Sequence, residues 1–122
     1  MLARILAILP AIAMGFNGVM WIINPAGAAE SLGMPLLEGM GLSTQAGDFT
    51  AFFIACSAMS ALAAIRLNPT WAYGAAMLLG GAAVFRTLAW GLHGAEFATV
   101  FIIVEAVLAA MLIASARLMK SN

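Results

Sequence analysis

The sequence predicts an all-α integral membrane protein: an antiparallel bundle of four transmembrane helices, with a short interfacial helix between helices 1 and 2. Of the 122 residues, 65% are hydrophobic and 8% are charged, and the mean hydropathy is +1.07. A soluble domain carries about a quarter charged residues, so this chain has too few charges to cover a globule with polar surface. A spanning helix needs about 20 apolar residues, and the sequence divides into four such runs. We therefore expect residues 1–122 to form a single four-helix transmembrane domain.

The first apolar run extends from Ile5 to Ile23 and stops at the Asn24-Pro25 pair. Its beginning also fits a secretory signal peptide, because Arg4 precedes an apolar stretch and Ala11-Ile12-Ala13 resembles a cleavage site. The apolar run continues well past this point, however. We therefore expect a retained first span.

Residues 24–47 form the one long connection. Asn24 can cap a helix that begins with Pro25, a favourable pairing at a helix start, and Gly33 can end it. This predicts a short helix over residues 25–33. The whole connection combines leucines and methionines with Glu30 and Glu38, a composition that favours the membrane surface.

Three further apolar runs follow the long connection. The second span starts near Thr44 or Asp48 and ends at Ile65. The third covers Trp71 to about Trp90, and the fourth runs from about Phe97 to Ala116. Residues 66–69 and 91–94 are short enough to be tight turns, so consecutive spans must be antiparallel.

The charged residues predict the orientation of the bundle. Alternating spans place four of the five basic residues on one side and four acidic residues on the other. Because Lys and Arg are enriched on cytoplasmic flanks, we expect both termini in the cytoplasm and the long connection outside. The formal net charge of zero gives no reason to expect a nucleic acid partner. The basic group is Arg4, Arg66, Arg117 and Lys120; the acidic group is Glu30, Glu38, Asp48 and Glu96.

Four polar residues lie within the predicted spans: Asn17, Asp48, Arg86 and Glu105. An ionisable group inside a span costs about 2.5–3.5 kcal/mol on insertion scales, so such groups usually face the bundle interior and have partners. We expect Arg86 to point inward and to contact at least one of Asp48 and Glu105, since its planar fork can serve two carboxylates. The cluster either fixes which helices face each other or binds a ligand, and the sequence leaves both open.

No catalytic or metal-binding motif is evident. The only cysteine, Cys56, excludes an intrachain disulfide and a cysteine-based metal site. His93 lies in a turn beside Glu96 without the further ligands that a metal requires. We find no phosphate-binding glycine loop and no nucleophile motif, so no catalytic residue, metal site or cofactor motif is predicted.

Three short segments carry a family resemblance: Gly47-Asp48-Phe49, Val84-Phe85-Arg86-Thr87-Leu88 and Ile103-Val104-Glu105-Ala106. They resemble the DoxX-like group of small four-helix bacterial membrane proteins, over roughly residues 5–116. The resemblance implies a bacterial inner (cytoplasmic) membrane location. Because some members of that group are associated with quinone-linked oxidoreductases, it also suggests a bound quinone or a partner subunit. The lack of a cysteine pair means that this chain cannot be a thiol catalyst.

Three functions compete at this point. The first is a non-catalytic protein that binds a small lipophilic molecule, a quinone or a lipid, in an outward-facing cavity near Asp48, Arg86 and Glu105. The second is an accessory subunit that docks onto a larger respiratory or photosynthetic complex, or onto further copies of itself. The third is an enzyme acting on a lipid substrate, with Glu105 or Asp48 as acid or base. Membrane lipids are expected partners in each case.

Overall fold

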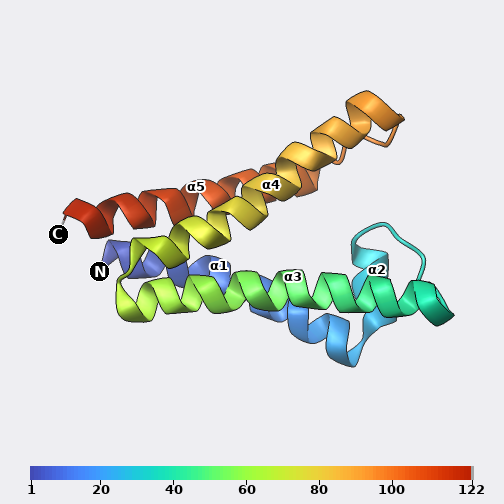
Figure 1. Ribbon diagram of the computed structural model, residues 1–122, viewed down its shortest axis with the longest axis horizontal. Coiled ribbons are helices and arrows are strands. Elements are labelled where there is room, and N and C mark those ends of the chain that lie inside the picture. Colours follow the sequence, from blue (N-terminus) through green and yellow to red (C-terminus); the bar gives the residue numbers. More distant parts are fainter. Residues whose placement is uncertain (122) are drawn as a thin grey trace.

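The computed structural model describes residues 1–121, with side chains through Met119, and this part of the chain is all helical apart from short connections. The side chain of Lys120 therefore lies outside the described residues. Four of the helices are long and apolar enough to cross a membrane, and they alternate in direction (Figure 1). This confirms the predicted four-helix membrane bundle and makes the chain a multi-pass membrane protein. The elements are α1 (Leu2–Ile23), α2 (Pro25–Ser31), α3 (Gly39–Arg66), α4 (Pro69–His93) and α5 (Thr99–Ser121).

Helix α2 forms where its local sequence predicts. The Asn24 side chain accepts a hydrogen bond from the Gly27 amide at 3.2 Å, and Pro25 occupies the first turn. The helix ends at Ser31, and Gly33 follows with a φ of +75°, a left-handed conformation that glycine adopts at little cost. A short helix between the first two spans is therefore confirmed, and its position at a membrane surface stays a prediction.

Helix α3 begins at Gly39, five residues before the earliest predicted start at Thr44. The buried Gln45 side chain stabilises these extra turns because it forms hydrogen bonds with backbone groups of the preceding loop. Its Oε1 accepts from the Leu37 amide at 2.9 Å, and its Nε2 donates to the Pro35 carbonyl at 3.0 Å. With 28 residues, α3 is about 42 Å long, longer than a hydrocarbon core of about 30 Å.

The spanning helices form two pairs, α1 with α3 and α4 with α5. The pairs meet near the two termini and the turn between α3 and α4, and they diverge toward the other ends of the helices (Figure 1). We call these two regions the closed end and the open end. Side chain-to-backbone hydrogen bonds tie the closed half together: Ser57 Oγ donates to the Ala11 carbonyl at 2.7 Å, and Ser115 Oγ donates to the Ala3 carbonyl at 2.6 Å.

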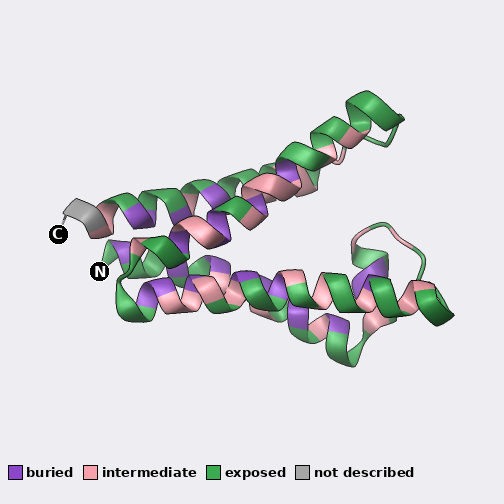
Figure 2. Ribbon diagram, viewed as in Figure 1, coloured by how far each residue is buried: buried purple, intermediate pink, exposed green. Residues whose placement is uncertain are grey.

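Burial follows the same gradient along the bundle. Figure 2 shows the buried residues along the faces where the helices meet, many of them toward the closed end. The last buried residue of α4 is Ala83, and the first buried residue of α5 is Ala109. Beyond these two alanines, neither helix has a fully buried side chain. The open-end halves of α4 and α5 therefore leave space between themselves and the α1–α3 pair.

Candidate functional site

Two adjoining cavities lie between the helix pairs, on the open-end side of the core. The inner cavity has a volume of about 260 Å³ and the outer one about 430 Å³. They share five lining residues: Leu32, Phe52, Phe53, Arg86 and Glu105. The walls are mostly apolar, with the charged groups gathered where the two cavities adjoin.

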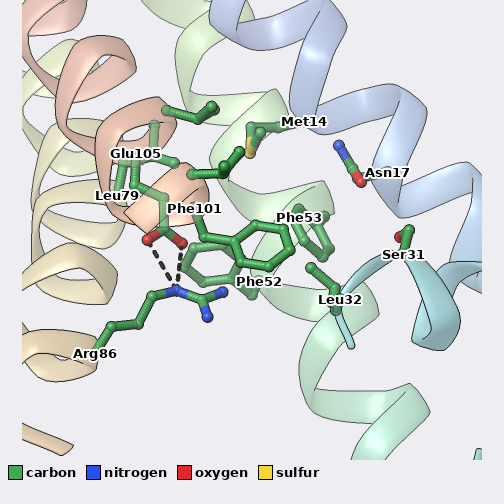
Figure 3. A pocket seen from close by; sticks show the side chains of 12 residues that line it. Met14, Asn17, Ser31, Leu32, Phe52, Phe53, Leu79, Arg86, Phe101 and Glu105 are labelled. Carbon is green, nitrogen blue, oxygen red and sulfur yellow. Dashed lines mark hydrogen bonds and ion pairs between the residues drawn. The ribbon is translucent and has the colours of Figure 1, made fainter. Parts of the chain in front are cut away.

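Arg86 and Glu105 form an ion pair between α4 and α5. The Nε of Arg86 donates to both oxygens of Glu105, at 2.9 Å and 3.2 Å (Figure 3). The Cζ of Arg86 also lies 4.9 Å from the ring centre of Phe101, a cation–π distance. The Glu105 side chain is 12% exposed and the Arg86 side chain 31%. The predicted contact between Arg86 and Glu105 is thus present, and the ring and carboxylate together hold the guanidinium in place.

The two Nη groups of Arg86 are the unused donors of this site. Within the described part of the chain, the hydrogen bonds of Arg86 all come from its Nε. Figure 3 shows the Nη groups directed away from Glu105 and toward the side of the cavity where Leu32 lies. Because a guanidinium is a donor at every nitrogen and stays charged, these groups can bind an acceptor that enters the cavity.

Asp48 lines the outer cavity from α3 but does not contact Arg86. The ion-pair partner of Arg86 among the described residues is Glu105, and the Asp48 side chain is exposed. The predicted contact of Asp48 with the second edge of the guanidinium is therefore absent. The physical reason is the divergence of α3 from α4 toward the open end, which places the two residues on different walls of the cavity.

Asn17 lines the inner cavity from α1. Its Nδ2 donates to the Ala13 carbonyl of the same helix at 2.9 Å, so the amide is partly satisfied by its own backbone. Asn17 belongs to the cavity wall, and its described hydrogen bond does not reach Arg86 or Glu105. Of the four polar residues predicted to cluster, only the arginine and one glutamate are in direct contact.

The aromatic lining was missed by the sequence analysis, although its spacing carries a signal. Phe52 follows Asp48 by four positions and Phe101 precedes Glu105 by four, so each aromatic ring shares a helix face with a polar candidate. Ser31, the last residue of α2, and the loop residue Leu32 also line the inner cavity. No local pattern points to them, because the position of this loop depends on α3 through Gln45.

The described residues contain no group of three or more His, Cys, Asp or Glu side chains that could hold a metal ion. Comparison of the chain with protein-family models, curated proteins and solved structures finds no match. The resemblance to the DoxX-like group therefore stays a prediction. What the site offers is an apolar, aromatic cavity with one anchored guanidinium and two carboxylates.

Proposed function

We propose that this chain is a non-catalytic membrane protein that binds one small amphiphilic molecule, a lipid or a quinone, in the cavity between its helix pairs. The observation that carries the proposal is the orientation of Arg86. Its Nε is held by Glu105, while its Nη groups face the cavity without a protein partner among the described residues. A polar head that accepts hydrogen bonds would complete the site.

The energetics of a membrane interior support this proposal. A hydrogen-bond donor left without a partner away from water costs about 1–3 kcal/mol, and more when the group is charged. Phe52, Phe53 and Met14 line the cavity with apolar surface suited to a hydrocarbon tail or ring. The cavity thus combines a donor for a polar head with an apolar wall for the rest of the molecule.

The setting of the site is part of the proposal. With the closed end, which carries Arg4 and Arg66, on the cytoplasmic side of a bacterial inner membrane, the cavity lies in the outer half of the bilayer. The resemblance to DoxX-like proteins is compatible with that setting. A ligand would then enter the cavity laterally from the outer leaflet or from the external surface.

Native mass spectrometry of the protein released from nanodiscs made with total membrane extract tests the proposal. We expect a retained small molecule of lipid or quinone mass. The Arg86→Met, Glu105→Leu double variant should lose it, while Arg66→Met, which changes an exposed arginine at the closed end, should keep it. Equal retention by the wild type and the double variant, with both folded, would contradict the proposal. A co-retained polypeptide in place of a small molecule would favour the accessory-subunit alternative.

A further inference from the structure

Resting on the proposed function, we infer that the ligand is a zwitterionic phospholipid, its phosphodiester on the Nη groups of Arg86 and its ammonium at Asp48. The charges that line the two cavities point to this ligand. The ionisable residues there are Arg86, Glu105 and Asp48. Since Glu105 already offsets the charge of Arg86, the lining as a whole has a formal charge of −1. A head group with a net negative charge is therefore disfavoured. The Nη groups of Arg86 can nevertheless still donate hydrogen bonds to an acceptor on the ligand.

The form of that fork selects the kind of acceptor. The two Nη groups of a guanidinium lie side by side, and they match two oxygens of one phosphate or carboxylate in a bidentate arrangement. A single quinone carbonyl has one oxygen, so it would leave one of the two Nη groups without an acceptor. A phosphodiester supplies two oxygens at the required spacing.

The second charge of the ligand is dictated by Asp48. Its carboxylate is exposed, lines the outer cavity and has no ion-pair partner among the described residues. A cationic group beside the phosphodiester would balance it. An ethanolamine-type head carries both charges within one short unit, so it can span from the α4 wall to the α3 wall.

The depth of both residues fits a phospholipid head group. Counted from the turn that joins α3 and α4, Asp48 lies 18 residues from Arg66 and Arg86 lies 17 residues from Pro69. At about 1.5 Å per residue, these separations are about 27 Å and about 26 Å, close to the far boundary of a hydrocarbon core of about 30 Å. The two charged groups therefore share one level, where head groups of the opposite leaflet lie.

The inner cavity provides for the acyl chain. It is lined by Leu79, which lies 10 residues from Pro69 and so about 15 Å from the turn, near the middle of the membrane. Met14 lines the same cavity from α1. An acyl chain that descends from the head group would meet apolar walls from the boundary to the bilayer centre.

The test uses protein in nanodiscs of equimolar phosphatidylethanolamine and phosphatidylglycerol with identical acyl chains, released into the gas phase to count retained lipids. We expect the wild type to retain phosphatidylethanolamine over phosphatidylglycerol by about two- to fivefold, the size expected for one ion pair near water. Asp48→Asn should abolish this preference, because it removes the carboxylate that pairs with the ammonium. The matched control Glu38→Gln removes an exposed acidic group outside both cavities and should keep the preference.

A second experiment changes the lipid and uses the wild-type protein. N-acetylated phosphatidylethanolamine keeps the phosphodiester but lacks the ammonium, and we expect it to be retained no better than phosphatidylglycerol. Equal retention of the two unmodified lipids by the wild type, or a preference that survives Asp48→Asn, would overturn the inference. If a small molecule is still retained through Arg86 in those cases, the proposed function stands and only the head-group assignment falls. If the wild type retains no small molecule in any bilayer, both fall.

Discussion

Arg86 and Glu105 share an ion pair, but their surroundings differ in a way that affects stability. The carboxylate is 12% exposed and accepts two hydrogen bonds from the same nitrogen, whereas the guanidinium is 31% exposed and faces a cavity. If the arginine is removed, the carboxylate stays buried without a partner. If the glutamate is removed, the arginine can turn toward the cavity opening. Removing the arginine side chain and removing the glutamate side chain should therefore lower stability by different amounts.

We predict that Arg86→Met lowers the free energy of unfolding in detergent by about 1–3 kcal/mol, because it leaves a largely buried carboxylate unpaired. Glu105→Leu should cost less, and the double variant should be more stable than Arg86→Met alone. Unfolding of the four proteins by denaturant titration measures the coupling. A parallel cycle with the exposed residues Arg66 and Glu96, which have no ion-pair partner among the described residues, should be additive. Additive losses at Arg86 and Glu105 would show that neither side chain depends on the other.

At the scale of elements, the α1–α3 contact depends on small residues of α1, and Gly15 is one of them. A Cβ atom placed on Gly15 would lie 2.9 Å from Ser57 Oγ, tighter than van der Waals contact. That hydroxyl is held by its hydrogen bond to the Ala11 carbonyl, so it cannot move aside without losing the bond. In α4, a Cβ on Gly81 would meet nothing within 4 Å.

We therefore predict opposite results for two identical substitutions. Gly15→Ala should destabilise the protein by about 1–2 kcal/mol, as overpacked helix contacts do. Gly81→Ala should be neutral or stabilising by up to about 1 kcal/mol, because alanine favours the helix. Thermal unfolding in detergent compares the two. A Gly15→Ala protein as stable as the wild type would mean that α1 and α3 can separate freely at this point.

Gln45 connects another pair of elements, the long loop and the start of α3. Its side chain is 4% exposed and bonds to two backbone groups of the loop, at Pro35 and Leu37. The same loop places Leu32 in the cavity wall. The position of the wall thus depends on one amide side chain.

We predict that Gln45→Leu accelerates hydrogen exchange of the Leu37 amide and exposes residues 33–38 to proteolysis, because the loop loses both bonds to α3 while the α4–α5 pair is unaffected. Ser43→Ala, an exposed neighbour on the same helix, is the control and should exchange like the wild type. Unchanged protection in the Gln45 variant would show that other contacts hold the loop.

At the scale of the whole molecule, the bundle is tied together at one end and divided at the other. Both termini and the turn between α3 and α4 lie at the closed end (Figure 1). There, hydroxyl groups of α3 and α5 reach the backbone of α1. Toward the open end each helix pair keeps its own contacts, which makes room for the cavity. The shape thus combines a tightly packed closed end with two cavities toward the open end.

Cysteine labelling tests how this shape is oriented. We predict that Glu96→Cys, at the open end, reacts with an impermeant maleimide in intact spheroplasts, whereas Thr70→Cys, at the closed end, reacts only after permeabilisation. The wild type is the control, because its single cysteine, Cys56, is fully buried and should stay unlabelled. Labelling of Thr70→Cys from outside would reverse the orientation.

The sequence by itself determined the features that depend on neighbours along the chain. The length of each apolar run against the bilayer thickness predicts four spans, and the Asn24-Pro25 pair predicts the start of α2. The contact between Arg86 and Glu105 was also predictable, since α4 and α5 are joined by a short turn and must lie side by side. In each case the physical cause lies within one segment or between two consecutive ones.

The tertiary structure alone decided which helices pair and where they separate. The close approach at Gly15 and Ser57 joins residues 42 positions apart, and it depends on surfaces that no local pattern describes. Asp48 lies at about the same depth as Arg86, yet the divergence of α3 and α4 keeps the two from contact. Likewise, the loop that begins with Leu32 at the cavity wall is tied to α3 by hydrogen bonds of Gln45, which no local pattern predicts. In a soluble protein, apolar periodicity shows which face of a helix avoids water. In lipid every face of a spanning helix avoids water, so this pattern does not identify the partner helix. Side-chain packing then decides which helices pair.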